Sequence, residues 1–208
     1  MKHYFITGIG TEVGKTVASA VLVQALQTNY WKPVQCGDLD WSDSHKIEAW
    51  VSHPVQIFPE THRLFHPMSP HAAAKRAGVE IQLTDFQWPQ SDRPILVEGA
   101  GGLLVPLNQQ DLMLDLIRHL QIEVIVVSRH YLGSINHTLL TMDVLKKAGL
   151  PVKGLLFNGD ENPDTESIIE RHIGADLVLG HLPNLPTIDP TQIAKAAEHL
   201  RGQPNFNL

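Results

Sequence analysis

The chain of 208 residues has one cysteine and no run of positive charge. A lone cysteine, Cys36, excludes an internal disulfide framework and is typical of a reducing compartment. Lysine and arginine never exceed two in succession and the formal net charge is −6, so no basic surface for nucleic acid or an anionic membrane is predicted. No stretch approaches the ~20 apolar residues of a membrane span, and the first apolar run is too short for a signal peptide. We therefore expect a soluble, cytoplasmic protein.

Short apolar runs alternate with amphipathic segments along the chain, and 43% of the residues are hydrophobic. The runs are continuous and rich in β-branched residues, as expected for strands buried on both faces of a parallel sheet. Strands are expected at residues 4–6, 94–97, 124–127, 152–157 and 177–179. Helices are expected at residues 16–27, 43–51, 69–77, 111–120, 134–148 and 188–201. Asp111 is expected to cap the fourth of them, and Gly149 to end the fifth. This alternation predicts one α/β domain over residues 1–208, with a loose tail from about residue 202.

A glycine loop, GIGTEVGKT at residues 8–16, follows the first expected strand and precedes a helix. Backbone N–H groups in such a turn point into one cavity and favour a polyphosphate. Lys15 would contact the β- and γ-phosphates, and the Thr16 hydroxyl would coordinate Mg²⁺. Five residues instead of the usual four separate Gly8 from Gly14, which indicates a variant loop. We expect a three-layer P-loop NTPase-type fold; a glycine-rich turn with a solvated lysine is the alternative.

Three charged residues lie near the ends of other expected elements. Such positions matter because ligands of open parallel sheets bind at the carboxyl ends of the strands. Glu98, before a Gly-Ala-Gly-Gly turn, could reach the same Mg²⁺ or be a capping or surface glutamate. Lys32, held extended by the next proline, could neutralise charge in phosphoryl transfer or be an exposed lysine. Asp43 could bind the metal, although capping of its helix is favoured by the sequence alone.

Three further features have two interpretations each. Cys36 is either a small buried hydrophobe or part of a site. Residues 133–136 begin a helix whose N-terminus could bind a carboxylate, or they form an ordinary helix start. Asn158 closes a strand, where its amide could contact a base edge or support a turn.

Seven segments in this order resemble the dethiobiotin synthetases, the ATP-dependent carboxylases of biotin synthesis. The segments are TGIGTEVGKT, KPVQCG, the pair Ser42-Asp43, MSPHAAA, LVEGAGGLLVP, LGSINHTLLT and GLLFN. The resemblance covers most of the chain from residue 4 to about residue 186. That family has the longer glycine loop, so the unusual spacing supports the resemblance.

The resemblance implies a role for each matching residue. Lys15 and Lys32 would be catalytic, with Lys32 near the carbamate, and Thr16, Asp43 and Glu98 would hold Mg²⁺. The ATP-binding residues would be Glu12, Val13, Gly14, Lys15, Thr16, Val17, Asp43, Glu98, Gly99, Ala100, Gly101, Asn158, Leu182, Pro183 and Asn184, the last four at the adenine base. The substrate-binding residues would be Thr11, Cys36, Gly133, Ser134, Ile135 and Asn136, the last four from the partner subunit.

The implied activity is closure of a cyclic urea. The enzyme would carboxylate 7,8-diaminopelargonic acid (7,8-diaminononanoate) with CO₂ or bicarbonate and ATP, and release dethiobiotin, ADP and phosphate as a homodimer. Two alternatives remain. A P-loop ligase of the cobyrinic acid synthase type would usually carry a glutaminase domain, for which this chain is too short. A partitioning-type switch ATPase would carry another lysine early in its loop, where this chain has Ile9, Gly10 and Thr11.

Overall fold

The computed structural model describes residues 2–206 and 208. Its strands are β1 (Tyr4–Gly8), β2 (Asn29–Trp31), β3 (Val34–Cys36), β4 (Ile57–Phe58), β5 (His62–Leu64), β6 (Ile95–Gly102), β7 (Glu123–Ser128), β8 (Val152–Asn158) and β9 (Val178–Leu182). Seven of them form a parallel sheet in the order β4-β2-β6-β1-β7-β8-β9, and β3 pairs with β5 in a second small sheet. The order reverses at β1, which lies in the middle of the large sheet.

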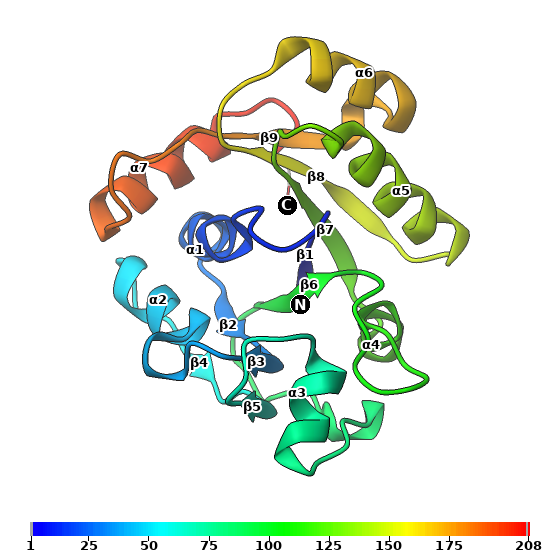
Figure 1. The fold of residues 1–208 in the computed structure, drawn as a ribbon. Coiled ribbons are helices and arrows are strands. Elements are labelled where there is room, and N and C mark those ends of the chain that lie inside the picture. Colours follow the sequence, from blue (N-terminus) through cyan, green and yellow to red (C-terminus); the bar gives the residue numbers. More distant parts are fainter. Residues whose placement is uncertain (1, 207) are drawn as a thin grey trace.

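Helices cover both faces of this sheet (Figure 1). They are α1 (Lys15–Leu26), α2 (Asp43–Trp50), α3 (Pro70–Ala77), α4 (Met113–Leu120), α5 (Ser134–Lys147), α6 (Pro163–Ile173) and α7 (Pro190–Arg201). α1, α2 and α7 pack together on one side, and α4, α5 and α6 lie on the other. The expected three-layer α/β fold is confirmed. Within residues 2–206 and 208, no helix has the length and apolar character that crossing a membrane requires.

The central strands are buried because their side chains are apolar on both faces. Phe5, Ile6, Leu96 and Val97 are fully buried, as is the run at residues 124–127. All five expected strands and six expected helices are present, with ends that differ by a few residues. Gly149 adopts the left-handed conformation after α5, with φ of 66°, and its N–H donates to the Lys146 carbonyl, as expected of a glycine that ends a helix.

Two local predictions were wrong. β6 continues through Gly102 where a turn was expected after Glu98. Asp111 does not cap α4; its carboxylate accepts a hydrogen bond from Asn108, and Asp115 accepts one from the backbone N–H that precedes the helix. Within the described residues after 202, the Asn205 amide donates to the carbonyls of Ala175 and Val178, each at 3.0 Å, and the loose tail stays a prediction.

Several short elements were not predicted. β2 has three residues and β4 has two, so neither shows a periodicity that the sequence could reveal. α6 was missed although Asn162 caps it by accepting from the Thr165 N–H and Pro163 starts it. β2 matters most for function, because it carries the chain to Lys32 beside β6.

Candidate active site

The glycine loop lies at the carboxyl end of β1, in the middle of the sheet, and leads directly into α1. Its backbone needs conformations that favour glycine: Gly14 has φ of 84°, and Glu12, with φ of 59°, adopts the same region. A Cβ atom at Gly8 would lie 2.6 Å from Val13 Cγ2, so the loop can fold back over β1 only without one. The predicted variant phosphate loop is therefore formed, between a strand and a helix.

Lys15 is buried under this loop, with 8% of its surface exposed. Its Nζ donates to the Gly10 carbonyl oxygen at 3.0 Å. Burial lowers the pKa of Lys15 to about 8, although the nearby Glu98 carboxylate partly opposes the shift. The alternative of a solvated lysine is thus wrong, and Lys15 is a desolvated cation held at the loop.

Glu98 is the acceptor that joins three elements. Its carboxylate accepts hydrogen bonds from Ser19 Oγ at 2.6 Å, Tyr30 Oη at 2.9 Å, Lys32 Nζ at 2.9 Å and Thr16 Oγ1 at 3.1 Å. The residue is 1% exposed, so the capping and surface interpretations are both wrong. A carboxylate this deeply buried is stable only because it is paired and hydrogen-bonded.

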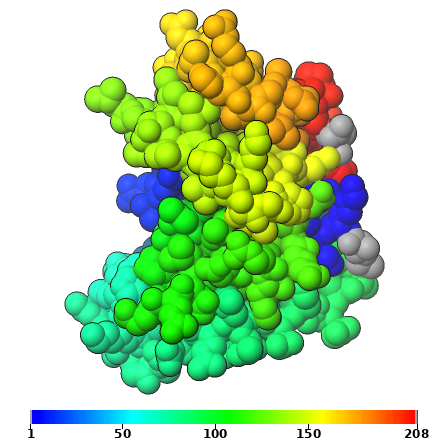
Figure 2. Space-filling view, turned by 90° about the vertical axis from the view of Figure 1, so that its right-hand side faces the viewer, coloured from blue at the N-terminus to red at the C-terminus, as the bar shows by residue number. Residues whose placement is uncertain are grey.

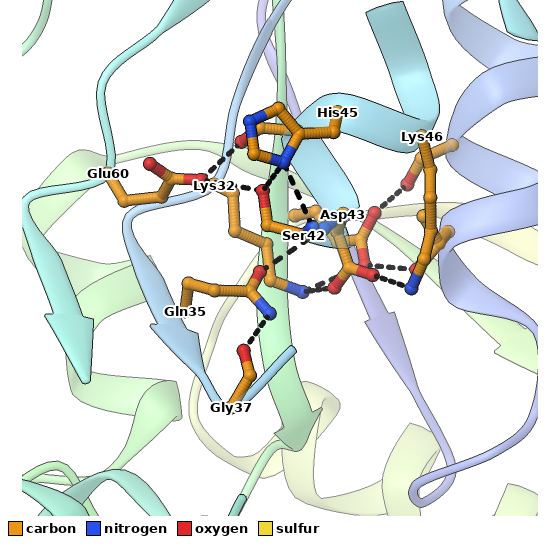
Figure 3. A network of polar contacts seen from close by, with 12 residues as sticks. Lys32, Gln35, Gly37, Ser42, Asp43, His45, Lys46 and Glu60 are labelled. Carbon is orange, nitrogen blue, oxygen red and sulfur yellow. Dashed lines mark hydrogen bonds and ion pairs between the residues drawn. The ribbon is translucent and has the colours of Figure 1, made fainter. Parts of the chain in front are cut away.

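Lys32 lies between two carboxylates (Figure 3). Its Nζ is 2.6 Å from Asp43 Oδ2 and 2.9 Å from Glu98 Oε1, and the residue is 4% exposed. Burial alone would lower the pKa of Lys32, but the two carboxylates outweigh burial and raise it above its usual value. Lys32 is therefore a permanent buried cation, and the interpretation as an exposed lysine is wrong.

Asp43 is the first residue of α2, and its carboxylate does not cap the helix. Ser42 occupies the capping position, with its N–H donating to His45 Nδ1 at 3.1 Å. Asp43 instead contacts Lys32 through one oxygen and Lys46 Nζ, at 3.1 Å, through the other. Burial would raise the pKa of Asp43, but Lys32 and then Lys46 more than offset it and hold the pKa below its usual value.

Lys46 was missed by sequence reasoning, although its position three residues after Asp43 on a helix was a usable signal. Tyr30 and Ser19 were also missed. Tyr30 lies in the short strand β2, and its buried hydroxyl has no signature in the sequence. Ser19 lies three residues after Thr16 in α1, which places both hydroxyls on the side of the helix that faces Glu98.

Thr16, Asp43 and Glu98 belong to one network of contacts. Thr16 Oγ1 contacts Glu98 directly, and the Lys32 ammonium bridges Glu98 and Asp43. Two carboxylates and a hydroxyl are the hard donors that Mg²⁺ prefers, and a cation between the carboxylates is already favoured there. The donor set therefore fits Mg²⁺.

A cavity of about 690 Å³ opens over this network. The predicted residues that line it are Thr11, Glu12, Gly14, Lys15, Thr16, Val17, Lys32, Cys36, Asp43, Glu98, Ala100 and Gly101. Cys36 faces the cavity, and burial raises the pKa of its thiol to about 11 although Lys32 opposes the shift. The thiol is thus protonated at neutral pH and is a weak nucleophile.

The remaining predicted residues lie elsewhere. Val13, within the glycine loop, is 2% exposed with its side chain toward Gly8, and Gly99 lies against the Phe5 ring. Residues 133–136 line a separate cavity of about 660 Å³ at the start of α5.

Asn158 and Leu182 pair at the ends of β8 and β9. Asn184 follows β9, where its amide donates to Asp160. With Pro183, these residues form a group apart from the main cavity, and the roles predicted for them stay predictions.

Known proteins resemble this chain along almost its whole length. A family model described as an AAA domain matches residues 2–192. The ATP-dependent dethiobiotin synthetase BioD of Christiangramia forsetii is 48% identical over 96% of this chain and 96% of that protein. The enzyme of the same name from Paramagnetospirillum magneticum is 41% identical over 93% of this chain and 94% of its own.

Solved structures share the fold at low identity. A ParA family ATPase from Chlorobium tepidum superposes with a TM-score of 0.53 at 13% identity, covering 96% of this chain and 99% of that chain. The MinC:MinD cell division protein complex of Aquifex aeolicus has a chain with a TM-score of 0.54 at 12% identity, covering 98% of this chain and 96% of that chain. These likenesses support the architecture alone.

Proposed function

Because this chain belongs to the family of ATP-dependent dethiobiotin synthetases, we propose that it closes the cyclic urea of dethiobiotin from 7,8-diaminopelargonic acid, CO₂ and ATP. The observation that carries the proposal is the junction of the glycine loop with the Lys32–Glu98–Asp43 network in one cavity. A phosphate loop alone would fit many nucleotide hydrolases. A second buried lysine beside it fits a reaction that transfers the phosphoryl group to an anionic oxygen, such as that of a carbamate.

The proposed reaction has three steps. One neutral amine of the substrate adds CO₂ and loses a proton to give a carbamate. A carbamate oxygen attacks the γ-phosphorus and ADP leaves, which gives a carbamic–phosphoric mixed anhydride. The second amine attacks the anhydride carbonyl, loses a proton and expels inorganic phosphate, which closes the ring.

Charge stabilisation is the main task of the protein in the second step, since the attacking and transferred groups are both anionic. Lys15 supplies one cation at the loop, and Lys32 supplies another on the side of Asp43 and Glu98. Both side chains are held before any ligand arrives, so little reorganisation is needed. Fixed positions of the two amines would make ring closure effectively unimolecular.

Thr16, Asp43 and Glu98 would hold Mg²⁺, which supplies charge neutralisation for the phosphates when bound. Thr16 and Ser19 keep Glu98 oriented from α1, and Tyr30 does so from β2. Lys32 would then keep its contact with these carboxylates on one side and face the carbamate on the other.

The substrate carboxylate would bind at residues 133–136 of a second copy, so the active form would be a homodimer in the cytoplasm. Figure 2 shows a face on which α5 and the loop after β6 flank part of the glycine loop. Exposed apolar side chains project from these segments, among them Leu104, Leu132 and Leu140. A groove of about 360 Å³ between the glycine loop, the segment after β6 and α5 also lies there. Contact with a second copy would bury this surface.

The test is phosphate release by purified protein with MgATP and bicarbonate, with and without 7,8-diaminopelargonic acid. The expected result is release that depends on the diamine, with a product heavier than the diamine by one carbonyl and lighter by two hydrogens in mass spectrometry. Release that ignores the diamine would contradict the proposal and favour a switch ATPase or another P-loop ligase.

A further inference from the structure

Asn158, the last residue of β8, reaches from the base end of the site to the glycine loop. Its Nδ2 donates to the Val13 carbonyl oxygen at 2.9 Å, across 145 positions of sequence. A Cβ atom at Gly14 would lie 2.1 Å from the same nitrogen, so the amide packs directly against the Gly14 α-carbon. Neither Val13 nor Asn158 lines the 690 Å³ cavity, whereas Gly14 does. The amide therefore supports the loop from the side opposite the cavity.

Because the peptide bond is planar, the contact at the Val13 carbonyl also fixes the direction of the Gly14 N–H. In a trans peptide the carbonyl of one residue and the N–H of the next point in opposite directions. The described residues contain no cis peptide bond, so the Val13 carbonyl and the Gly14 N–H obey this rule. When Asn158 holds the Val13 carbonyl outward, the Gly14 N–H must point the other way, toward the cavity. Backbone N–H groups aimed in this way are what a phosphate loop uses to bind its ligand.

We infer that Asn158 is a positioning residue for the glycine loop: it fixes the Val13–Gly14 peptide so that the Gly14 N–H faces the phosphates. Lys15 contacts the loop at another point, through the Gly10 carbonyl oxygen. The Asn158 carbonyl oxygen and second amide hydrogen are left for the base. One side chain thereby links base recognition to phosphate affinity. The inference rests on the proposed function only in taking ATP as the ligand.

The variants that test this role are Asn158→Ala, which removes the contact, and Asn158→Asp, which keeps the shape but removes the donor. The matched control is Asn184→Ala, since its amide donates to Asp160 and not to the loop, while its predicted place is along the same base. Hydrogen exchange of the peptide at residues 8–17 is measured in the ligand-free proteins. Both Asn158 variants should exchange faster there, with residues 123–128 unchanged, and Asn184→Ala should match the wild type.

The second readout is calorimetric titration with MgATP and with magnesium tripolyphosphate, which has no base. Loss of the hydrogen bond to the loop should weaken tripolyphosphate binding roughly three- to tenfold in the Asn158 variants. MgATP binding should weaken by at least as much, because Asn158→Ala also removes the groups left for the base. Asn184→Ala should weaken MgATP alone. If Asn158→Ala weakened MgATP but left tripolyphosphate binding and loop exchange unchanged, Asn158 would contact the base only and the inference would be overturned. Neither readout uses the diamine, so failure of the synthetase assay would not produce either result.

Discussion

Glu98 and Lys32 are 1% and 4% exposed, whereas Leu132, just before the predicted carboxylate-binding segment, is fully exposed. The main cavity and the separate cavity at the start of α5 thus differ in how far their lining groups are paired. In the network under the glycine loop, the charges of Lys32, Asp43 and Glu98 are paired with one another within one chain. The start of α5 offers apolar side chains and backbone to solvent, which a second copy would complete. Charges that stabilise a reaction must be fixed in advance, and a binding surface can be assembled later.

The largest expected effect comes from removing the centre of the network. Glu98→Ala leaves Lys32 and the Tyr30 hydroxyl buried without their acceptor, and should lower the free energy of unfolding by about 3–5 kcal/mol. Urea denaturation measures the change. The control is Glu161→Ala, whose side chain is 76% exposed and which should change stability by less than about 0.5 kcal/mol. Equal effects of the two variants would contradict the account of Glu98.

Lys32→Met tests the catalytic end directly. The substitution keeps the aliphatic bulk of the side chain but removes the cation between Asp43 and Glu98, and should lower kcat by about 10²-fold or more. Stability also falls because two carboxylates lose their shared partner. Turnover is therefore assayed at a temperature where circular dichroism shows a folded protein. Lys75→Met, at an exposed lysine of α3, is the control. Wild-type turnover in Lys32→Met would remove Lys32 from the mechanism.

Leu132→Asp tests the exposed surface at the start of α5. A charge at this fully exposed position should disrupt contact between copies and raise KM for the diamine by on the order of tenfold. MgATP affinity should not change, because the phosphate network belongs to one chain. Light scattering gives the oligomeric state. Phe65→Asp is the control, since Phe65 is 76% exposed but lies in another segment, after β5. A dimer that survives Leu132→Asp would place the interface elsewhere.

The smallest expected effect is a pH dependence of ATP binding. Burial lowers the pKa of Lys15 to about 8, so the side chain loses its proton as the pH rises through that value. Affinity for MgATP should fall by up to about tenfold between about pH 7 and about pH 9, as the charged fraction of Lys15 falls. Calorimetry at several pH values measures this. Lys15→Met should bind more weakly at every pH and lack this dependence; the same slope in that variant would assign it to another group.

Sequence reasoning succeeded where the signal was local. The glycine loop, the strand before it and the helix after it are encoded by neighbouring residues, and the structure contains all three. It failed for Asp43, where capping was the favoured interpretation. Ser42 caps α2 instead, and the Asp43 carboxylate contacts Lys32, which lies in a different segment. No local pattern could show this, because the partner of a charged residue depends on packing.

The sequence by itself determined the α/β class, the order of the main elements, the phosphate loop and the family. Hydrophobic runs, glycine positions and helix periodicity depend on residues that are close in the sequence, so a single sequence is enough to detect them. Only the tertiary structure decided that Thr16, Tyr30 and Lys32 share one buried carboxylate, with Glu98 between 66 and 82 positions away from them. The same holds for Asn158 beneath the glycine loop. Such contacts arise when β1, β2, β6 and β8 are aligned in parallel, which brings their carboxyl ends to one edge of the sheet.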